Sequence, residues 1–171
     1  MEALKLKQQG GETRMKKDQL QTMSITFRQI CEGERDWTAL GNFMNYWYAY
    51  AKDRRAELIA EPLPAYDETS LYQHRWAVFC AASVEWFCNK YAVSCPSWVH
   101  DPNYTLSEPW FFHLHEPVKS RLMQTTPKEF TRRNVFCGDN IYANKWEFIE
   151  NWRKSLTYKE KHKALLPEEQ V

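Results

Sequence analysis

Apolar side chains recur every three or four residues along much of the chain, as they do in helices that bury one face. A first helix is predicted from residue 20 to Gly33, and its apolar stripe consists of Leu20, Met23, Phe27 and Ile30. A second is predicted from the N-cap Asp36 to Ala60, because a Pro-Leu-Pro sequence follows. Gly41 lies inside its apolar stripe. Since glycine costs a helix about 1 kcal/mol, we expect another helix to pack closely there.

The broadest apolar face belongs to a third helix, which Thr69 or Ser70 can cap and which extends to Tyr91. A face this wide is typical of the central helix of a core. Its apolar residues are Leu71, Tyr72, Trp76, Phe79, Cys80, Val84, Phe87 and Tyr91.

Residues 93–117 break this pattern, because they contain four prolines with aromatic residues between them. A loop of this length is uncommon within a compact domain unless it is functional or wraps the protein. Its rings would be costly to expose, so we predict an ordered loop that they pin to the core. These rings are Trp98, Tyr104, Trp110, Phe111 and Phe112.

The remainder of the chain predicts short helices. Thr126-Pro127-Lys128-Glu129 has the cap, proline and acid of a helix start, and Gly138 marks a break. A last helix is predicted over residues 143–156, with Trp146, Ile149 and Trp152 on one side.

No segment alternates apolar and polar residues as a strand does, so the predicted fold is mainly α. We expect a compact single-domain bundle of about five helices with one long ordered loop rich in proline and aromatic residues. The helical domain covers residues 18–157. A flexible N-terminal tail at 1–17 and a charged C-terminal tail at 158–171 are predicted to flank it.

Composition narrows the class of protein. The nine Phe, eight Trp and nine Tyr residues outnumber the 25 Leu, Ile and Val residues, and the net charge of +1 argues against a general polyanion binder. Five cysteines without a C-x-x-C pair fit a reducing compartment. With neither a signal-like N-terminus nor an apolar stretch of bilayer length, the sequence predicts a cytoplasmic protein without a membrane partner.

Catalytic chemistry has little support in the sequence. The histidines His100, His113 and His115 are of a metal-ligating type, and a small metal-dependent hydrolase is the second alternative function. Their spacing lacks the paired pattern of zinc sites, so we predict no metal, no cofactor and no catalytic residue. Cys95 beside His100 is the one local nucleophile pairing, and no family signature surrounds it. Enzyme activity is left open, and a non-enzymatic role is favoured.

A basic segment offers the first alternative function, a nucleic-acid-binding regulator using residues 117–145. Between 117 and 133 it holds five basic residues against one acidic residue, Glu129. Guanidinium, ammonium and amide groups of this kind contact phosphates and bases. The competing interpretation is a solvated face paired with acids elsewhere. The candidate residues are Lys119, Arg121, Lys128, Arg132, Arg133, Asn134 and Lys145.

Four segments carry a resemblance to a known family. They are Phe27-Arg28-Gln29-Ile30, the stretch Trp37 to Phe43, the stretch Trp76 to Glu85 and the stretch Trp98 to Leu106. The likeness continues through the stretches Glu108 to Phe111 and Phe130 to Phe136. The chain resembles, from about residue 24 to 152, a family of small uncharacterised bacterial proteins. Relatives are sometimes encoded beside nucleotidyltransferase-like toxins, as an antitoxin or accessory partner would be. The resemblance implies such a partner and supplies no catalytic residues.

The leading hypothesis is therefore a non-enzymatic protein-binding subunit, an antitoxin-like or defence-system accessory protein that restrains a partner enzyme. Trp, Tyr and Arg side chains contribute most of the binding energy at protein interfaces, and the chain is rich in them. The predicted partner-binding residues are Trp98, Tyr104, Trp110, Phe111, Arg132, Arg133, Trp146 and Trp152.

Overall fold

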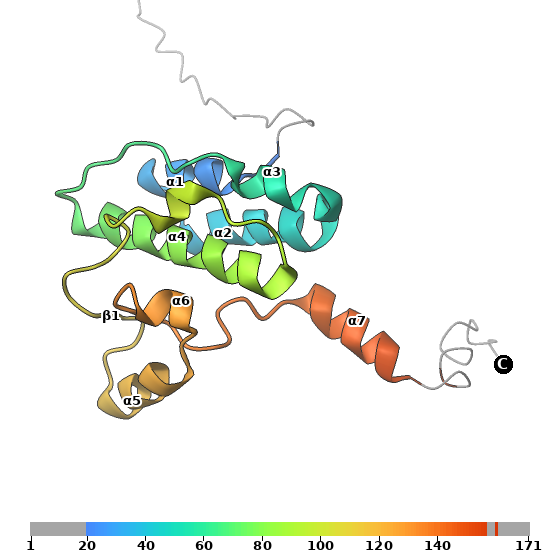
Figure 1. Cartoon of the computed structure of the whole chain (residues 1–171). Helices are drawn as coiled ribbons and strands as arrows, with labels where there is room; N and C mark the ends of the chain where they lie inside the picture. Colours follow the sequence, from blue (N-terminus) through green and yellow to red (C-terminus); the bar gives the residue numbers. More distant parts are fainter. Residues whose placement is uncertain (1–19, 157–159, 161–171) are drawn as a thin grey trace, which may run out of the picture.

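The computed structural model of the chain describes residues 20–156 and Glu160. Apart from Glu160, the predicted tails at 1–17 and 158–171 lie outside these residues. Seven α-helices, one π-helical turn, two 3₁₀ turns and one pair of two-residue strands make up the regular structure of the described part, which confirms a mainly α fold. In Figure 1, α4 (Leu71–Tyr91) crosses the middle of the molecule, between α1 (Met23–Cys31) and α2 (Asp36–Asn45) on one side and α6 (Lys128–Thr131) on the other.

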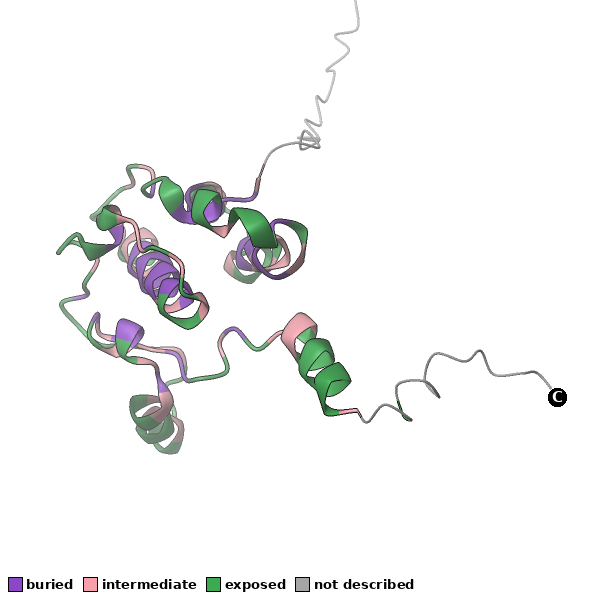
Figure 2. Cartoon of the chain, turned by 45° about the vertical axis from the view of Figure 1, so that its right-hand side comes forward, coloured by how far each residue is buried: buried purple, intermediate pink, exposed green. Residues whose placement is uncertain are grey.

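The central helix α4 is where the sequence predicts the core. The Ser70 side chain caps it by accepting a hydrogen bond from the Gln73 amide, and the helix ends at Ala92 in a left-handed conformation. It is almost continuously buried from Trp76 to Cys88 (Figure 2). Leu71 and Tyr72, predicted on its apolar face, are 58% and 50% exposed because the first turn extends beyond this buried stretch. No helix of the described residues is long and apolar enough to cross a membrane.

The predicted helix from Asp36 to Ala60 is wrong as a single element. It divides into α2, a π-helical turn η1 (Tyr46–Tyr50), a 3₁₀ turn η2 (Lys52–Arg54) and a short α3 (Arg55–Ala60). The π turn takes in one extra residue, and both Trp47 and Tyr48 are buried beside it. Ala51 then leaves the helical conformation, with φ −138° and ψ 41°. At the other end the N-cap is Arg35, one residue before Asp36.

The close helix packing expected at Gly41 is also absent. A Cβ atom built on Gly41 would meet no other atom within 4 Å, so no neighbouring helix requires a glycine there. Gly41 instead lines a cavity between α2 and the C-terminal helix α7 (Lys145–Ser155).

We expect the substitution Gly41→Ala to raise the free energy of unfolding by about 1 kcal/mol, because alanine favours the helix and meets no clash. Urea unfolding followed by circular dichroism measures this change. Gly33→Ala is the matched control, since Gly33 has φ +98° and should lose stability when it gains a side chain. A Gly41→Ala variant that is less stable than the parent would contradict this account of Gly41.

The loop over residues 93–117 is ordered and pinned by its rings, as predicted. Trp98 in the 3₁₀ turn η3 (Ser97–His100) donates its indole N–H to the Ile59 carbonyl at 3.0 Å. Trp110 packs edge to face on Trp76, with ring centroids 5.4 Å apart. The loop also contains an unpredicted strand, β1 (Trp110–Phe111), which pairs in parallel with β2 (Val135–Phe136). Trp110 is opposite Val135 in this register.

The last elements follow the predicted order. α5 (Glu116–Thr125) begins just before Pro117, inside the predicted loop, and Pro127 immediately precedes α6 rather than forming its first residue. Gly138 makes the predicted break with φ +84°. The predicted last helix is α7, which extends away from the rest of the molecule in Figure 1.

Candidate functional site

Helix α7 carries an exposed apolar face. Phe148 is 72% exposed, Trp152 50% and Ile149 39%. Phe148 and Trp152 are one turn apart and Ile149 lies beside them, so the three side chains share one side of the helix. No residue of α7 is buried, and Figure 2 shows it exposed beyond its first turn. We name Phe148, Ile149 and Trp152 the α7 face.

Of the α7 face, Trp152 is a predicted partner-binding residue and Phe148 is not. The signal for Phe148 was present in the sequence, because it precedes Trp152 by four residues within the predicted last helix. Trp146, the other predicted residue of this helix, is half-buried and packs against the core. It therefore belongs to the attachment of α7 rather than to its exposed face.

The first turn of α7 is anchored to the end of α4. The Glu147 carboxylate accepts a hydrogen bond from the Tyr91 hydroxyl and forms an ion pair with Lys90 Nζ at 3.0 Å. The Asn144 side chain caps the helix by accepting from the Glu147 amide at 2.9 Å. Polar contacts thus fix one end of the helix while the α7 face stays exposed.

This anchor should weaken in acid. Burial raises the pKa of Glu147, but hydrogen bonds from Tyr91 and Lys90 outweigh that effect and hold the pKa below its ordinary value of about 4.5. Since the folded pKa is depressed, the carboxylate stabilises the docked helix above pH 4.5 and this stabilisation is lost as the pH falls below it. We expect hydrogen-exchange protection of the α7 amides to fall between pH 5 and pH 3 (roughly the titration range of glutamate). Glu147→Gln should remove that dependence, and a parent protein with pH-independent protection would contradict it.

A buried ion cluster joins α4 to the end of α6. Arg133 Nη1 donates to Glu85 Oε2 at 2.6 Å, and Arg132 pairs with the other oxygen of the same carboxylate. Arg133 Nη2 also donates to the Val99 carbonyl at 2.8 Å. The side chains of Glu85 and Arg133 are 8% and 7% exposed, whereas that of Arg132 is 51% exposed. The guanidinium of Arg133, which was predicted to bind a partner, is thus bonded inside the protein.

Residues predicted for three different functions meet at this cluster. A cavity of about 270 Å³ is lined by Glu85, Arg132, Arg133, His100, Asp101, Pro102, Tyr104 and Thr105. Tyr104 is a predicted partner-binding residue, the two arginines are candidates for partner and nucleic-acid binding, and His100 is a candidate metal ligand. The sequence did not predict that Glu85 would bind both arginines at this cavity. No sequence spacing signals a contact between α4 and α6.

The loop rings predicted to bind a partner are half-buried. Trp98 and Tyr104 pack edge to face with centroids 5.9 Å apart, and Phe111 stacks on Phe136 at 4.6 Å. Trp110 lies against the ring of Phe79 as well as Trp76. These contacts hold the loop on the body of the protein and leave only part of each ring for another molecule.

The basic segment does not form one free cationic surface. Lys119 is paired with Glu116 at 2.8 Å and lies over the ring of Phe111. The Asn134 amide donates to the Leu106 carbonyl at 2.7 Å, and the two arginines bind Glu85. Of the seven predicted nucleic-acid contacts, four are exposed, and they lie in three different helices or at their ends: Arg121, Lys128, Arg132 and Lys145. The competing interpretation, in which basic residues pair with acids, holds for three of them. Lys119 pairs with Glu116, and Arg132 and Arg133 pair with Glu85.

Within the described part of the chain, the three candidate histidines lie in two different places. His113 and His115 are exposed between β1 and α5, whereas His100 lines the cavity beside Glu85. Within residues 20–156 and Glu160, no three His, Cys, Asp or Glu side chains come close enough together to hold a metal ion. Burial raises the pKa of the Cys95 thiol, so the thiolate that a nucleophile requires is disfavoured. All five cysteines are free, and three of them, Cys80, Cys88 and Cys137, are buried.

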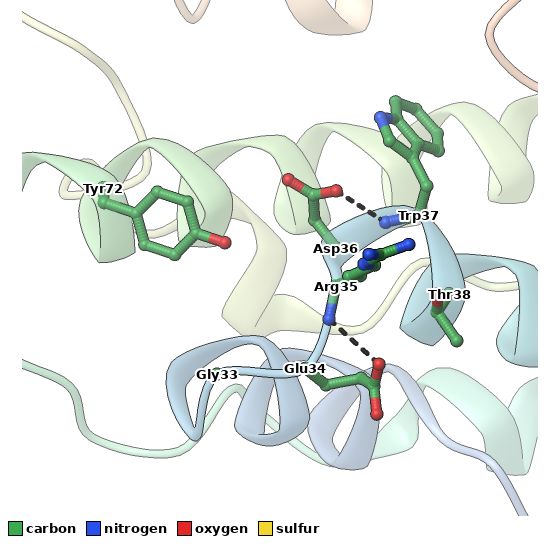
Figure 3. A pocket seen from close by; sticks show the side chains of 7 residues that line it. All are labelled: Gly33, Glu34, Arg35, Asp36, Trp37, Thr38 and Tyr72. Carbon is green, nitrogen blue, oxygen red and sulfur yellow. Dashed lines mark hydrogen bonds between the residues drawn. The ribbon is translucent and has the colours of Figure 1, made fainter.

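Two adjoining cavities follow the outer side of α2. The first, of about 590 Å³, lies at the start of the helix and is lined by residues 33–38 and Tyr72. Figure 3 shows Tyr72 of α4 with its hydroxyl directed toward the Asp36 carboxylate, which accepts a hydrogen bond from the Trp37 amide at 2.7 Å. Trp37 and Thr38 also line the second cavity, of about 390 Å³, which lies between α2, η1 and the start of α7. We name this second one the α2–α7 cavity.

The described part of the chain is thus mainly helical, and its helix α7 exposes the aromatic side chains Phe148 and Trp152. Comparisons of the chain with protein-family models, with curated proteins and with solved structures find no match.

Proposed function

We propose that this chain is a non-enzymatic binding subunit that holds a partner protein through the α7 face. The observation that carries the proposal is the exposure of Phe148, Ile149 and Trp152 together on a helix that extends from the body. Contiguous exposed apolar side chains are typical of interaction sites, while isolated ones are ordinary. Aromatic side chains, tryptophan above all, are frequent centres of binding energy.

The charged residues around the α7 face suit an interface rim. Glu150 and Lys154 are paired at 3.0 Å on the same helix, and Arg153 lies between Trp152 and Lys154 in the sequence. Protein interfaces commonly surround an apolar centre with polar residues that remain partly hydrated. The α7 face with these neighbours has that composition.

The partner that we propose is an enzyme of the nucleotidyltransferase-like toxin class, which this chain would restrain as an antitoxin does. The support for this class is the resemblance of residues 24–152 to proteins encoded beside such toxins. A role as a nucleic-acid-binding regulator has less support, because Arg132, Arg133 and Asn134 are engaged within the protein.

Co-expression tests the proposal. The full chain is produced together with a nucleotidyltransferase-like toxin from the same host, one of the two proteins carrying an affinity tag. We expect the two proteins to copurify as a stoichiometric complex and the chain to relieve the growth arrest that the toxin causes. If the chain neither copurifies with the toxin nor relieves growth arrest, the antitoxin proposal fails.

A further inference from the structure

The α2–α7 cavity has the lining of a ligand site, and the partner-binding proposal makes no use of it. Its volume of about 390 Å³ is in the usual range for small-molecule sites. Trp37 and Trp146 contribute rings to it, from α2 and α7 respectively. The cavity adjoins a π-helical turn, a feature that occurs frequently at functional sites.

Gly41 keeps one wall of this cavity open. A glycine inside a helix costs about 1 kcal/mol relative to alanine. At Gly41 no helix packs close enough to require the missing side chain, and the space where a side chain would be belongs to the cavity. An occupant of the cavity accounts for the glycine, because a larger residue would take its volume.

The two amide side chains of the lining are accessible, with Asn42 exposed and Asn45 half-buried. Asn42 and Asn45 are three residues apart on one side of α2, and neither side-chain amide makes a hydrogen bond to another described residue. Two free amides side by side can each donate and accept, as recognition of the edge of a heteroaromatic ring requires.

Tyr48 adds a buried hydroxyl to the lining. The residue is 2% exposed, and its hydroxyl makes no hydrogen bond of acceptable geometry with a described residue, although Tyr91 and Asn144 lie near it. Buried polar groups without a partner are rare in proteins and commonly mark a place where another group binds.

Positive charge is concentrated at one end of the cavity. Lys145 is the single charged residue among the described residues that line it, and its ammonium lies over the ring of Trp146, 4.9 Å from the centroid. Lys145 is also the first residue of α7, where Asn144 caps the Glu147 amide and the amides of Lys145 and Trp146 remain to attract an anion. One anionic group would thus be held where the lysine and the helix start coincide.

We propose that the α2–α7 cavity binds a nucleoside monophosphate. The base stacks on the exposed part of the Trp37 ring, and Asn42 and Asn45 bond to its edge. Lys145, over the ring of Trp146, holds the phosphate with the start of α7. A wholly apolar ligand would leave the buried Tyr48 hydroxyl without a partner, and a triphosphate would bring still more uncompensated charge to the one lysine than a monophosphate does. The site stands independently of the partner bound at the α7 face.

Isothermal titration calorimetry of the full chain tests the site, with AMP, GMP, CMP and UMP as probes and with adenosine and inorganic phosphate as partial ligands. We expect at least one nucleotide to bind with one site per chain, and phosphate alone not to bind. Lys145→Gln should weaken binding of the nucleotide about tenfold and leave binding of the matching nucleoside unchanged. Asn42→Ala, at an exposed position, should weaken both about fivefold.

Gly41→Leu takes up part of the cavity and should weaken binding strongly, whereas Gly41→Ala, which adds one methyl group, serves as the control for helix effects. Circular dichroism establishes that each variant is folded, and Asn42→Ala supplies an independent test if Gly41→Leu is not. The proposal is overturned if none of the four nucleotides binds at millimolar concentration. It is equally overturned if folded Gly41→Leu or Asn42→Ala protein binds them as the parent does.

Discussion

Glu85→Ala is expected to lower the free energy of unfolding by about 3–5 kcal/mol, the effect of removing one partner of a buried ion pair. Without the carboxylate, the guanidinium of Arg133 would remain buried without its ion-pair partner, with hydrogen bonds to the Glu129 and Val99 carbonyls left. Burial already lowers the pKa of Arg133 below its usual value, which reflects the cost of keeping that charge away from water. The loss is measured by urea or guanidinium unfolding monitored by circular dichroism.

Two variants separate this charge effect from a general loss of packing. Arg132→Gln removes the exposed partner of the same carboxylate, and it should cost no more than about 1 kcal/mol because the side chain is 51% exposed. The double variant Glu85→Leu with Arg133→Met removes both buried charges, and should recover most of the stability lost by Glu85→Ala. Equal losses for Glu85→Ala and Arg132→Gln would contradict the assignment of the buried pair.

The helices were predictable from the sequence wherever one apolar stripe stays in phase with the helical turn. This holds for α4 from Trp76 onward, and for α7, whose stripe includes Ile149 and Trp152. The prediction fails after Asn45. The apolar residues keep their helical spacing through η1, so the sequence does not reveal the extra residue of the π turn. Alanine is a good helix former, so the residue type at Ala51 gives no sign that the helix is interrupted there.

The strands and the buried ion cluster could not be predicted for a different reason. Each strand has two residues, too few to display an alternation, and Trp110 finds its partner Val135 through a pairing distant in sequence. Glu85 and Arg133 are likewise 48 positions apart. Local charge counting placed Arg133 in a basic surface, because the acid that neutralises it comes from another helix.

The exposed residues of α7 represent a third case, in which the pattern is right and its meaning depends on the fold. An apolar stripe on a helix predicts burial, and the same stripe on α4 is buried from Trp76 onward. On α7 it remains exposed, since only the first turn is anchored through Glu147. The difference between a core helix and a binding helix therefore lies in what packs against it, which the periodicity alone does not contain.

The double substitution Phe148→Ser with Trp152→Ser is expected to reduce affinity for the partner toxin at least about a hundredfold. Hot-spot residues each cost about 2 kcal/mol or more when they are truncated, and about 1.4 kcal/mol corresponds to a factor of ten. The stability of the isolated chain should change by less than about 0.5 kcal/mol, because neither side chain is buried. Surface plasmon resonance measures the affinity and urea unfolding the stability.

The matched control removes equally exposed apolar side chains from another part of the surface. Leu114 is 79% exposed and Met123 in α5 is 59% exposed, so Leu114→Ser with Met123→Ser makes a similar change in surface character away from α7. This control should bind the toxin as the parent chain does. A control that loses binding while the α7 variant keeps it would place the interface near α5, and equal losses would indicate nonspecific apolar adhesion. Selective loss in the α7 variant would attribute recognition to the α7 face, because its stability and overall hydrophobicity match those of the control.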